Sequence, residues 1–253
     1  MDLSNNEVRH IKNNGVEYLE FKAFDDFRNS ITAAFVIRGE NEQYYCDPDS
    51  KEFMVRANNE IGLTNIVQIK EQIHSDKSVI IANESDIPNE VDALLTNRKN
   101  IALLTRVADC IAVLAYDPIT NTIANIHSGW RGTIKRIAPK TIGRMCKEFG
   151  ARPEDVICAL CPSIGPDHFE VDDDVREIFS TEFGDKYITS SGDKYLIDAA
   201  KYVAASLIEV GVRPENIHNS NICTVCHSDL LHSYRASKMI EQKYRNAAII
   251  SLK

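Results

Sequence analysis

The sequence lacks any run of apolar residues long enough to cross a lipid bilayer. One of its longest such stretches, Cys110 to Tyr116, is far shorter than the roughly 20 residues that a membrane-spanning helix needs. The first six residues, Met1 to Asn6, show neither the basic region nor the apolar region of a secretory signal. We therefore expect a cytoplasmic protein with no membrane partner.

Positive charge is also scarce. Lys and Arg number 29 against 37 Asp and Glu, which gives a net charge of −8 near neutral pH. A chain with this balance has no general attraction to phosphate backbones or anionic lipids. The composition argues against nucleic acid as the main partner, and the sequence alone predicts no protein partner.

The counts of cysteine and histidine argue against a disulfide framework and against a group of several copper centres. Seven cysteines are an odd number, and in a reducing cytosol they are more often buried, metal-ligating or nucleophilic than disulfide-bonded. Seven histidines would nearly all be needed for several copper centres, whereas one zinc ion with an open position needs about three protein ligands. A single metal ion is therefore easier to accommodate than a copper cluster.

No low-complexity segment or polar linker interrupts the 253 residues, which are enough to bury a core without disulfides. We expect one domain, residues 1–253, with an α+β fold in which mixed β-sheets are flanked by helices. Apolar β-branched residues and turn-rich borders predict seven strands. These are Val16–Lys22, Ile31–Ile37, Ile66–Lys70, Val79–Ala82, Ile101–Thr105, Cys110–Tyr116 and Thr122–Ile126.

Helical patterns are clearest in the second half of the chain. Apolar residues over 134–149 recur at helical spacing, with Gly150 placed to end the helix and Pro139 expected to bend its middle. Two further helices are predicted over 172–183 and 198–211.

The densest group of reactive residue types surrounds the hairpin predicted over 110–126. Cys110 begins one strand and His127 ends the other, so antiparallel pairing makes neighbours of residues that are 17 apart in sequence. A thiolate beside an imidazole is either half of a zinc site or a nucleophile with its base. The structural alternative is a packed cysteine and a histidine in a turn.

Two CxxC pairs, Cys158–Cys161 and Cys223–Cys226, have the local spacing of a zinc-ribbon tetrad. However, 61 residues separate them, and the first pair lies in an apparent buried strand, in which residues three apart face opposite sides. We expect buried packing, with a four-cysteine zinc site or a redox pair as alternatives. Four of the histidines are expected at the surface: His10, His218, His227 and His232.

Five motifs resemble those of the family variously named YfiH, YlmD or laccase-domain proteins, described as purine nucleoside phosphorylases with adenosine deaminase activity. The matches are Gln72-Ile73-His74-Ser75 (Q-x-H-G), Val107-Ala108-Asp109-Cys110 (T-A-D-C), His127-Ser128-Gly129-Trp130-Arg131-Gly132 (H-A-G-W-R-G), Pro162-Ser163-Ile164-Gly165-Pro166 (G-P-x-I-G-P), and Cys223-Thr224 with Ser233-Tyr234-Arg235 (C-T…S-Y-R). The resemblance covers most of the chain and implies a YfiH-like fold.

The resemblance implies a zinc site made of His74, Cys110 and His127, which would also be the catalytic centre, with copper as another occupant of the same ligands. Two imidazoles and one thiolate leave a fourth position open, as in catalytic zinc sites. Such a zinc ion can lower the pKa of a bound water to about 7.

The implied reactions are phosphorolysis of adenosine, inosine, guanosine or methylthioadenosine, which makes the enzyme a transferase, and deamination of adenosine, which makes it a hydrolase. Purine nucleosides and inorganic phosphate are thus the expected partners. Arg38, Arg131 and Arg235 are the expected substrate contacts, because guanidinium binds phosphate in a bidentate manner.

The chain departs from the family pattern in two places that bear on substrate binding. The family's T-R-x-G-G-x-S is reduced to residues 37–40, around Arg38, and its G-P-C-C-Y-E-V is replaced over 165–171. One alternative is therefore a nucleoside-binding protein with weakened activity. The other is a hydrolase in which His127 activates Cys110 as a nucleophile.

Overall fold

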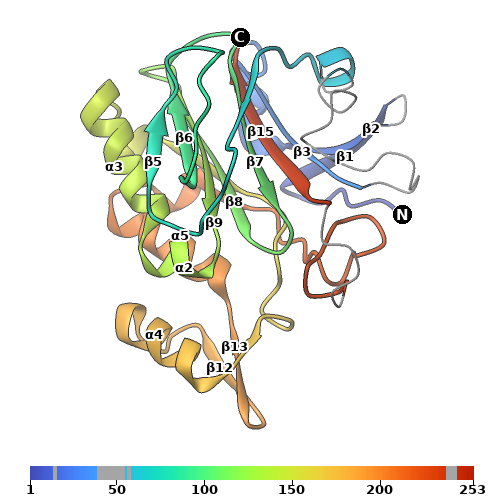
Figure 1. Cartoon of the computed structure of the whole chain (residues 1–253), viewed down its shortest axis with the longest axis vertical. Coiled ribbons are helices and arrows are strands. Elements are labelled where there is room, and N and C mark those ends of the chain that lie inside the picture. The colour runs from blue at the N-terminus through green and yellow to red at the C-terminus, as the bar shows by residue number, and fades with distance from the viewer. Residues whose placement is uncertain (14–15, 39–54, 56–57, 238–243) are drawn as a thin grey trace.

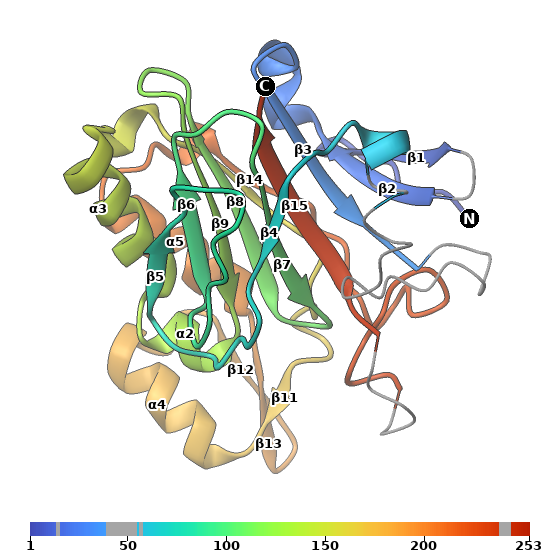
Figure 2. The same cartoon turned by 45° about the horizontal axis from the view of Figure 1, so that its top comes forward.

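The computed structural model describes residues 1–13, 16–38, 55, 58–237 and 244–253. Two six-stranded sheets lie face to face, and helices cover the outer face of one of them (Figures 1 and 2). A smaller unit of one helix and three short strands extends from one end (Figure 1). Within the described ranges, no helix combines the length and the apolar character needed to cross a membrane.

The first sheet has the strand order β1-β2-β3-β15-β7-β4. Its strands are β1 (Val8–Asn13), β2 (Val16–Phe21), β3 (Ile31–Val36), β15 (Asn246–Leu252), β7 (Ala102–Val107) and β4 (Ile66–Gln68). Only β4 and β7 pair in parallel; the other neighbours are antiparallel. Strand β15, from the far end of the sequence, therefore lies inside the sheet, between β3 and β7.

The second sheet has the order β14-β10-β8-β9-β6-β5. Its strands are β14 (Ile217–Asn219), β10 (Ile157–Leu160), β8 (Ile111–Asp117), β9 (Thr122–Ser128), β6 (Ala93–Thr96) and β5 (Ser78–Ile80). Two of its pairs, β10 with β14 and β5 with β6, are parallel. Both sheets are thus mixed, which confirms the predicted fold class, and all seven predicted strands are present.

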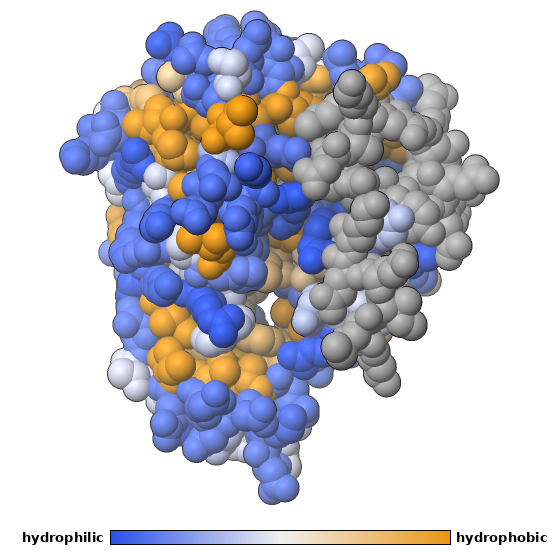
Figure 3. Space-filling view, in the orientation of Figure 1, coloured by the Kyte–Doolittle hydropathy of each residue, from blue (hydrophilic) through white to orange (hydrophobic). Residues whose placement is uncertain are grey.

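The helices α2 (Trp130–Ile134), α3 (Ile137–Phe149) and α5 (Ala199–Glu209) lie beside the second sheet (Figure 2). The smaller unit contains α4 (Asp173–Phe183) and a sheet of β11 (Glu170–Val171), β13 (Lys194–Ile197) and β12 (Ile188–Ser191). Short 3-10 helices cover Lys22–Phe27, Pro153–Asp155 and Pro214–Asn216. In the view of Figure 3, hydrophobic surface gathers in the lower part of the molecule, over the region of α4.

The prediction of a single helix bent at Pro139 was wrong. Helix α2 ends at Ile134, and Arg136 adopts a left-handed conformation with φ of 61° before α3 begins. Pro139 then falls in the first turn of α3, where its missing N–H has no intrahelical acceptor to lose, so it needs no bend. Gly150 ends α3 with φ of 77°, as predicted.

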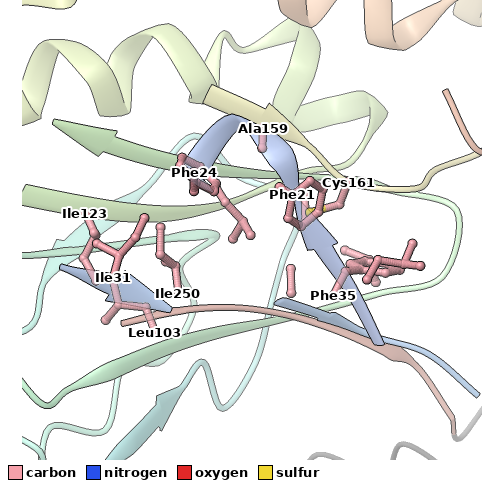
Figure 4. Packing of buried hydrophobic residues seen from close by; sticks show 14 of the residues in the cluster. Phe21, Phe24, Ile31, Phe35, Leu103, Ile123, Ala159, Cys161 and Ile250 are labelled. Carbon is pink, nitrogen blue, oxygen red and sulfur yellow. The ribbon is translucent and has the colours of Figure 1, made fainter. Parts of the chain in front are cut away.

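The central strand β8 is buried on both faces. Leu114 and Tyr116 pack in the hydrophobic cluster between the two sheets, whereas Ile111 and Val113 pack in the cluster beneath α3 and α5. Figure 4 shows the cluster between the sheets, where Leu103, Phe35 and Ile250 of the first sheet lie near Ile123 and Ala159 of the second. The β8–β9 hairpin is therefore held rigidly from both sides.

One polar side chain crosses from the second sheet to the first. Asn125 on β9 is fully buried, and its Nδ2 donates hydrogen bonds to the backbone oxygens of Leu103 (2.8 Å) and Ala248 (2.7 Å). Its Oδ1 accepts a hydrogen bond of 2.6 Å from the Thr105 hydroxyl. Since apolar contacts alone tolerate sliding, this amide fixes how the two sheets are placed against each other.

Replacing Asn125 by Ala should lower the free energy of unfolding by about 3 kcal/mol, because it opens a cavity and removes the acceptor of a buried hydroxyl. Urea denaturation of both proteins measures the difference. The exposed Asn97 offers a matched control, and Asn97→Ala should change stability by less than about 0.5 kcal/mol. Equal effects of the two substitutions would contradict a linking role for Asn125.

Candidate metal centre and adjoining cavity

The three residues expected to bind a metal lie together. His74 is in the loop between β4 and β5, Cys110 directly precedes β8, and His127 lies on β9. The Cys110 Sγ atom is 3.7 Å from His74 Nε2, and one ligand atom from each of the three side chains lies within 4.8 Å of the others. The β8–β9 register, which pairs Ala112 with His127, brings Cys110 and His127 together as the hairpin prediction required.

A fully buried carboxylate, Asp92, orients both histidines. Its Oδ1 lies 2.8 Å from His127 Nδ1 and accepts a hydrogen bond of 3.0 Å from the backbone N–H of His74. Its Oδ2 accepts two hydrogen bonds of 2.6 Å from Ser75, one from the N–H and one from the hydroxyl. With Nδ1 bound to Asp92, Nε2 is the ring nitrogen that His127 can offer to a metal ion.

The electrostatics of the site favour a thiolate. Burial opposes ionisation of Cys110, but attraction to His127 and hydrogen bonds from both histidines outweigh it and lower the thiol pKa to about 6. Burial likewise opposes a charge on His127, yet Cys110 and Asp92 raise its pKa to about 9. Hydrogen bonds from His127 and Ser75 overcome burial and lower the pKa of Asp92 to about 2. A thiolate is the form in which cysteine binds metals or attacks as a nucleophile.

Gly129 leaves room for this arrangement. A Cβ atom at position 129 would lie 2.4 Å from Cδ2 of His74 and 3.2 Å from the sulfur of Cys110. Any side chain larger than hydrogen would therefore push His74 away from Cys110. The φ of −65° at Gly129 suits any residue, so backbone conformation does not require glycine at this position. Glycine is required because the His74 ring and the Cys110 sulfur lie so close to its Cα atom.

A cavity of about 850 Å³ adjoins the three side chains, all of which line it. Its walls include the aromatic rings of Trp130 and Phe169 and the charged groups of Arg131 and Arg235. The volume lies within the range of about 300–1,000 Å³ that is typical of small-molecule sites.

Of the three arginines predicted to contact substrate, Arg131 and Arg235 line the cavity and Arg38 does not. Arg131 lies over the Trp130 ring, with Cζ 4.1 Å from the ring centroid, and Arg235 donates to the backbone oxygens of His168 (2.9 Å) and Glu170 (3.1 Å). Arg38 is not among the described residues that line the cavity, and its Nη1 lies 3.4 Å from the Ser228 oxygen.

Two lining arginines, Arg106 and Arg245, were missed by sequence reasoning. Arg106 lies within the apolar strand β7, and Arg245 directly precedes β15. Neither position belongs to one of the five motifs, so no local signal marked them.

Asp109 joins motifs that are far apart in the sequence. Its Oδ1 accepts a hydrogen bond of 2.5 Å from the Thr224 hydroxyl, and its Oδ2 accepts one of 2.6 Å from the N–H of Arg235. Its backbone oxygen accepts from the N–H of Ile164 at 2.9 Å. The residue before Cys110 therefore binds the segments around 164, 224 and 235 to the rim of the cavity.

The remaining cysteine and histidine predictions had mixed outcomes. Cys158 on β10 packs beneath α3 and Cys161, which follows β10, packs between the two sheets, so both are buried as expected, and neither joins a metal-binding group among the described residues. The expectation of buried packing was wrong for Cys226, which is exposed, and Cys223 is only half-buried. The prediction of surface positions was wrong for His10 and His232. The His10 side chain is 1% exposed beside Glu17, and burial together with nearby arginine charge lowers the pKa of His232 to about 4.

Fold and site together define an α+β protein with a His-Cys-His group beside a cavity. The family model described as "Multi-copper polyphenol oxidoreductase laccase" matches residues 50–253. The chain therefore belongs to this laccase-domain family, which includes the proteins YfiH and YlmD, as its motifs indicated.

Three known proteins illustrate the relationship. The chain is 31% identical over 218 residues to a purine nucleoside phosphorylase of Bacteroides thetaiotaomicron, covering 78% of this chain and 81% of the relative. It is 34% identical over 149 residues to adenosine deaminase RL5 of an unknown prokaryotic organism, covering 57% and 56%. The crystal structure of YlmD from Geobacillus stearothermophilus matches 100% of both chains with a TM-score of 0.82 at 21% identity. Both curated relatives carry the names of enzymes, which confirms the expectation that this chain is an enzyme.

Gly129→Ala should weaken metal binding by His74, Cys110 and His127 by about 10- to 100-fold, with zinc as the probe ion, because the added methyl group displaces His74 from its position. Competition with a chromophoric zinc chelator measures the affinity. Gly143 is the control, because a Cβ there meets nothing, and Gly143→Ala within α3 should leave zinc binding unchanged. If both variants bound zinc equally well, the proposed reason for glycine at 129 would be wrong.

Asp92→Asn should likewise reduce metal affinity, measured with zinc as the probe ion, by about 10- to 100-fold, since an amide holds the His127 tautomer less firmly than a carboxylate. The same chelator competition reports the loss. The exposed Glu90 provides a matched carboxylate-to-amide change, and Glu90→Gln should bind zinc as the unaltered protein does. Full affinity in the Asp92→Asn protein would show that this carboxylate does not support the site.

Proposed function

We propose that this chain is a zinc-dependent purine nucleoside enzyme, which cleaves nucleosides with inorganic phosphate and deaminates adenosine. The observation that carries the proposal is the group of His74, Cys110 and His127 on the wall of a cavity that also presents aromatic rings and guanidinium groups. The names of the relatives, one a purine nucleoside phosphorylase and the other an adenosine deaminase, support the substrate class.

The donor atoms fit a zinc ion. Tetrahedral zinc with sulfur at about 2.3 Å and nitrogen at about 2.0 Å places these two ligands roughly 3.6 Å apart, and Cys110 Sγ lies 3.7 Å from His74 Nε2. Two imidazoles and one thiolate leave a position for substrate or water, as catalytic zinc sites do. When bound, zinc would supply Lewis acidity for activating water or polarising a substrate oxygen. Copper binds the same donor types and would compete for the site.

The cavity walls suit a nucleoside and a phosphate ion. Phe169 and the face of Trp130 that Arg131 does not cover offer flat apolar surfaces on which a purine can stack. Arg131, and the N–H groups of Arg235 that are not bonded to the His168 and Glu170 oxygens, offer positive charge to an anion. In phosphorolysis the phosphate oxygen bonds to the ribose carbon as the glycosidic bond breaks, and the purine departs with its bonding electrons. The arginines would hold the phosphate close to that carbon. Arg38 stays a predicted substrate contact that the described cavity wall does not support.

A second function is favoured by one specific arrangement. Cys110, His127 and Asp92 form a chain of nucleophile, base and orienting carboxylate, and the pKa of Cys110 is lowered to about 6. This is the order of groups used by cysteine hydrolases. Such an enzyme would keep its activity after zinc has been removed, whereas the leading proposal requires the metal.

Zinc-loaded protein should release hypoxanthine from inosine only when phosphate is present, and ammonia from adenosine. His74→Ala and Cys110→Ser should each lower both rates by at least about 100-fold, as loss of a metal ligand does. His218, on β14 at the far edge of the second sheet, serves as the control, and His218→Ala should keep full activity.

The other outcomes separate the alternatives. Activity that survives a chelator would favour the cysteine hydrolase, and nucleoside binding without turnover would favour a binding protein. Absence of both products and of binding would contradict the nucleoside proposal as a whole.

We extend the proposal to the whole chain and to its location. Segments around residues 72, 110, 127, 164 and 235 all contribute to one cavity wall, which supports a single domain over 1–253. Nucleosides and phosphate are cytoplasmic metabolites in the proposed reaction, and a cytoplasmic location stays a prediction.

A further inference from the structure

A second group of metal-binding side chains lies in the described part of the chain and shares no residue with the first. His168, Cys223 and Cys226 each offer one donor atom, and these atoms lie within 4.8 Å of one another. We propose that these three residues bind a second zinc ion, which has a structural rather than a catalytic role.

The distances from the two sulfur atoms to the imidazole nitrogen match those of a zinc site. The sulfur atoms of Cys223 and Cys226 lie 3.6 and 3.7 Å from His168 Nδ1. Tetrahedral zinc requires about 3.6 Å between a sulfur and a nitrogen ligand. Two thiolates and one imidazole are soft and borderline ligands, which select zinc over magnesium or calcium.

The surroundings of Cys223 fit a metal-bound thiolate. The N–H of Gly165 donates a hydrogen bond of 3.2 Å to the sulfur, and a Cβ on Gly165 would lie 3.1 Å from Cβ of Cys223. The absence of a side chain therefore lets the backbone approach the sulfur. The Gly165 oxygen also accepts from the N–H of His168 at 3.0 Å, so one glycine turn places the imidazole and supports the thiolate.

The position of this group explains what the ion would do. It would join the turn at 165–168 to the turn at 223–226, two segments that are already linked by a β-bridge between Ser163 and Cys223. Arg235 donates to the backbone oxygen of His168, and Thr224 donates to Asp109, so both segments hold residues at the rim of the cavity. None of the three side chains is among the described residues that line the cavity, so a substrate bound there would not reach this ion, and this favours a structural role although the chain supplies only three ligands.

Metal content provides the first test, and it does not depend on the proposed function. Protein purified with zinc and reductant should contain two zinc ions per chain by elemental mass spectrometry. His168→Gln and Cys226→Ser should each reduce this to one, His74→Ala should also leave one, and the His74→Ala/His168→Gln double variant should contain none. His218→Gln is the histidine control and should retain two.

Cobalt substitution assigns the ions to their sites. The cobalt held by the His74→Ala protein should show a stronger thiolate-to-metal charge-transfer band than that held by His168→Gln, because the second site supplies two sulfurs and the first only one. A single zinc per unaltered chain that disappears in His74→Ala would overturn the proposal.

A measurement on the unaltered protein covers the case in which a variant fails to fold. Zinc should slow alkylation of the exposed Cys226 by about 10-fold or more, and a chelator should restore it, since metal-bound thiolates are protected. Peptide mass spectrometry reads the modified residue. Equal alkylation with and without zinc, or a Cys223–Cys226 disulfide in the zinc-loaded reduced protein, would refute the second site.

Discussion

The geometry of the candidate metal centre depends on the hydrogen bonds that stabilise the buried charge of Asp92. A carboxylate without exposure to water must be matched by donors or become protonated, and the four donors here come from His127, His74 and Ser75. Because those donors belong to the loop after β4 and to β9, the same charge fixes both elements relative to β6. The orientation of the His127 ring and the position of His74 beside Cys110 both follow from it.

The sequence was most informative where contacts are local. The β8–β9 hairpin and the nearness of Cys110 and His127 follow from strand alternation and turn chemistry within 20 residues, and both are present. His74 needed the family resemblance, because nothing in its own segment shows which strand it faces. Asp92 could not be found, since its partners come from 17 and 35 residues away and no motif surrounds it.

Long-range packing explains why the sequence did not predict the burial of His10 or the group formed by His168, Cys223 and Cys226. The burial of His10 depends on the β1–β2 pairing and a contact with Glu17, which a hydropathy pattern does not display. The CxxC spacing of Cys223 and Cys226 suggested a zinc site completed by two more cysteines. In the structure their neighbour is instead His168, which lies in a segment where the chain departs from the family pattern. A local CxxC spacing identifies half of such a group, and only the fold shows what lies opposite.

The place of β15 has a consequence for how the chain is made. This strand lies between β3 and β7 in the first sheet, although it is formed by residues 246–252. Until the ribosome has released those residues, β3 and β7 each have an edge with no strand beside it, and such edges attract other chains. The first sheet can therefore close only after residues 246–252 have been made, although its other five strands come earlier in the sequence.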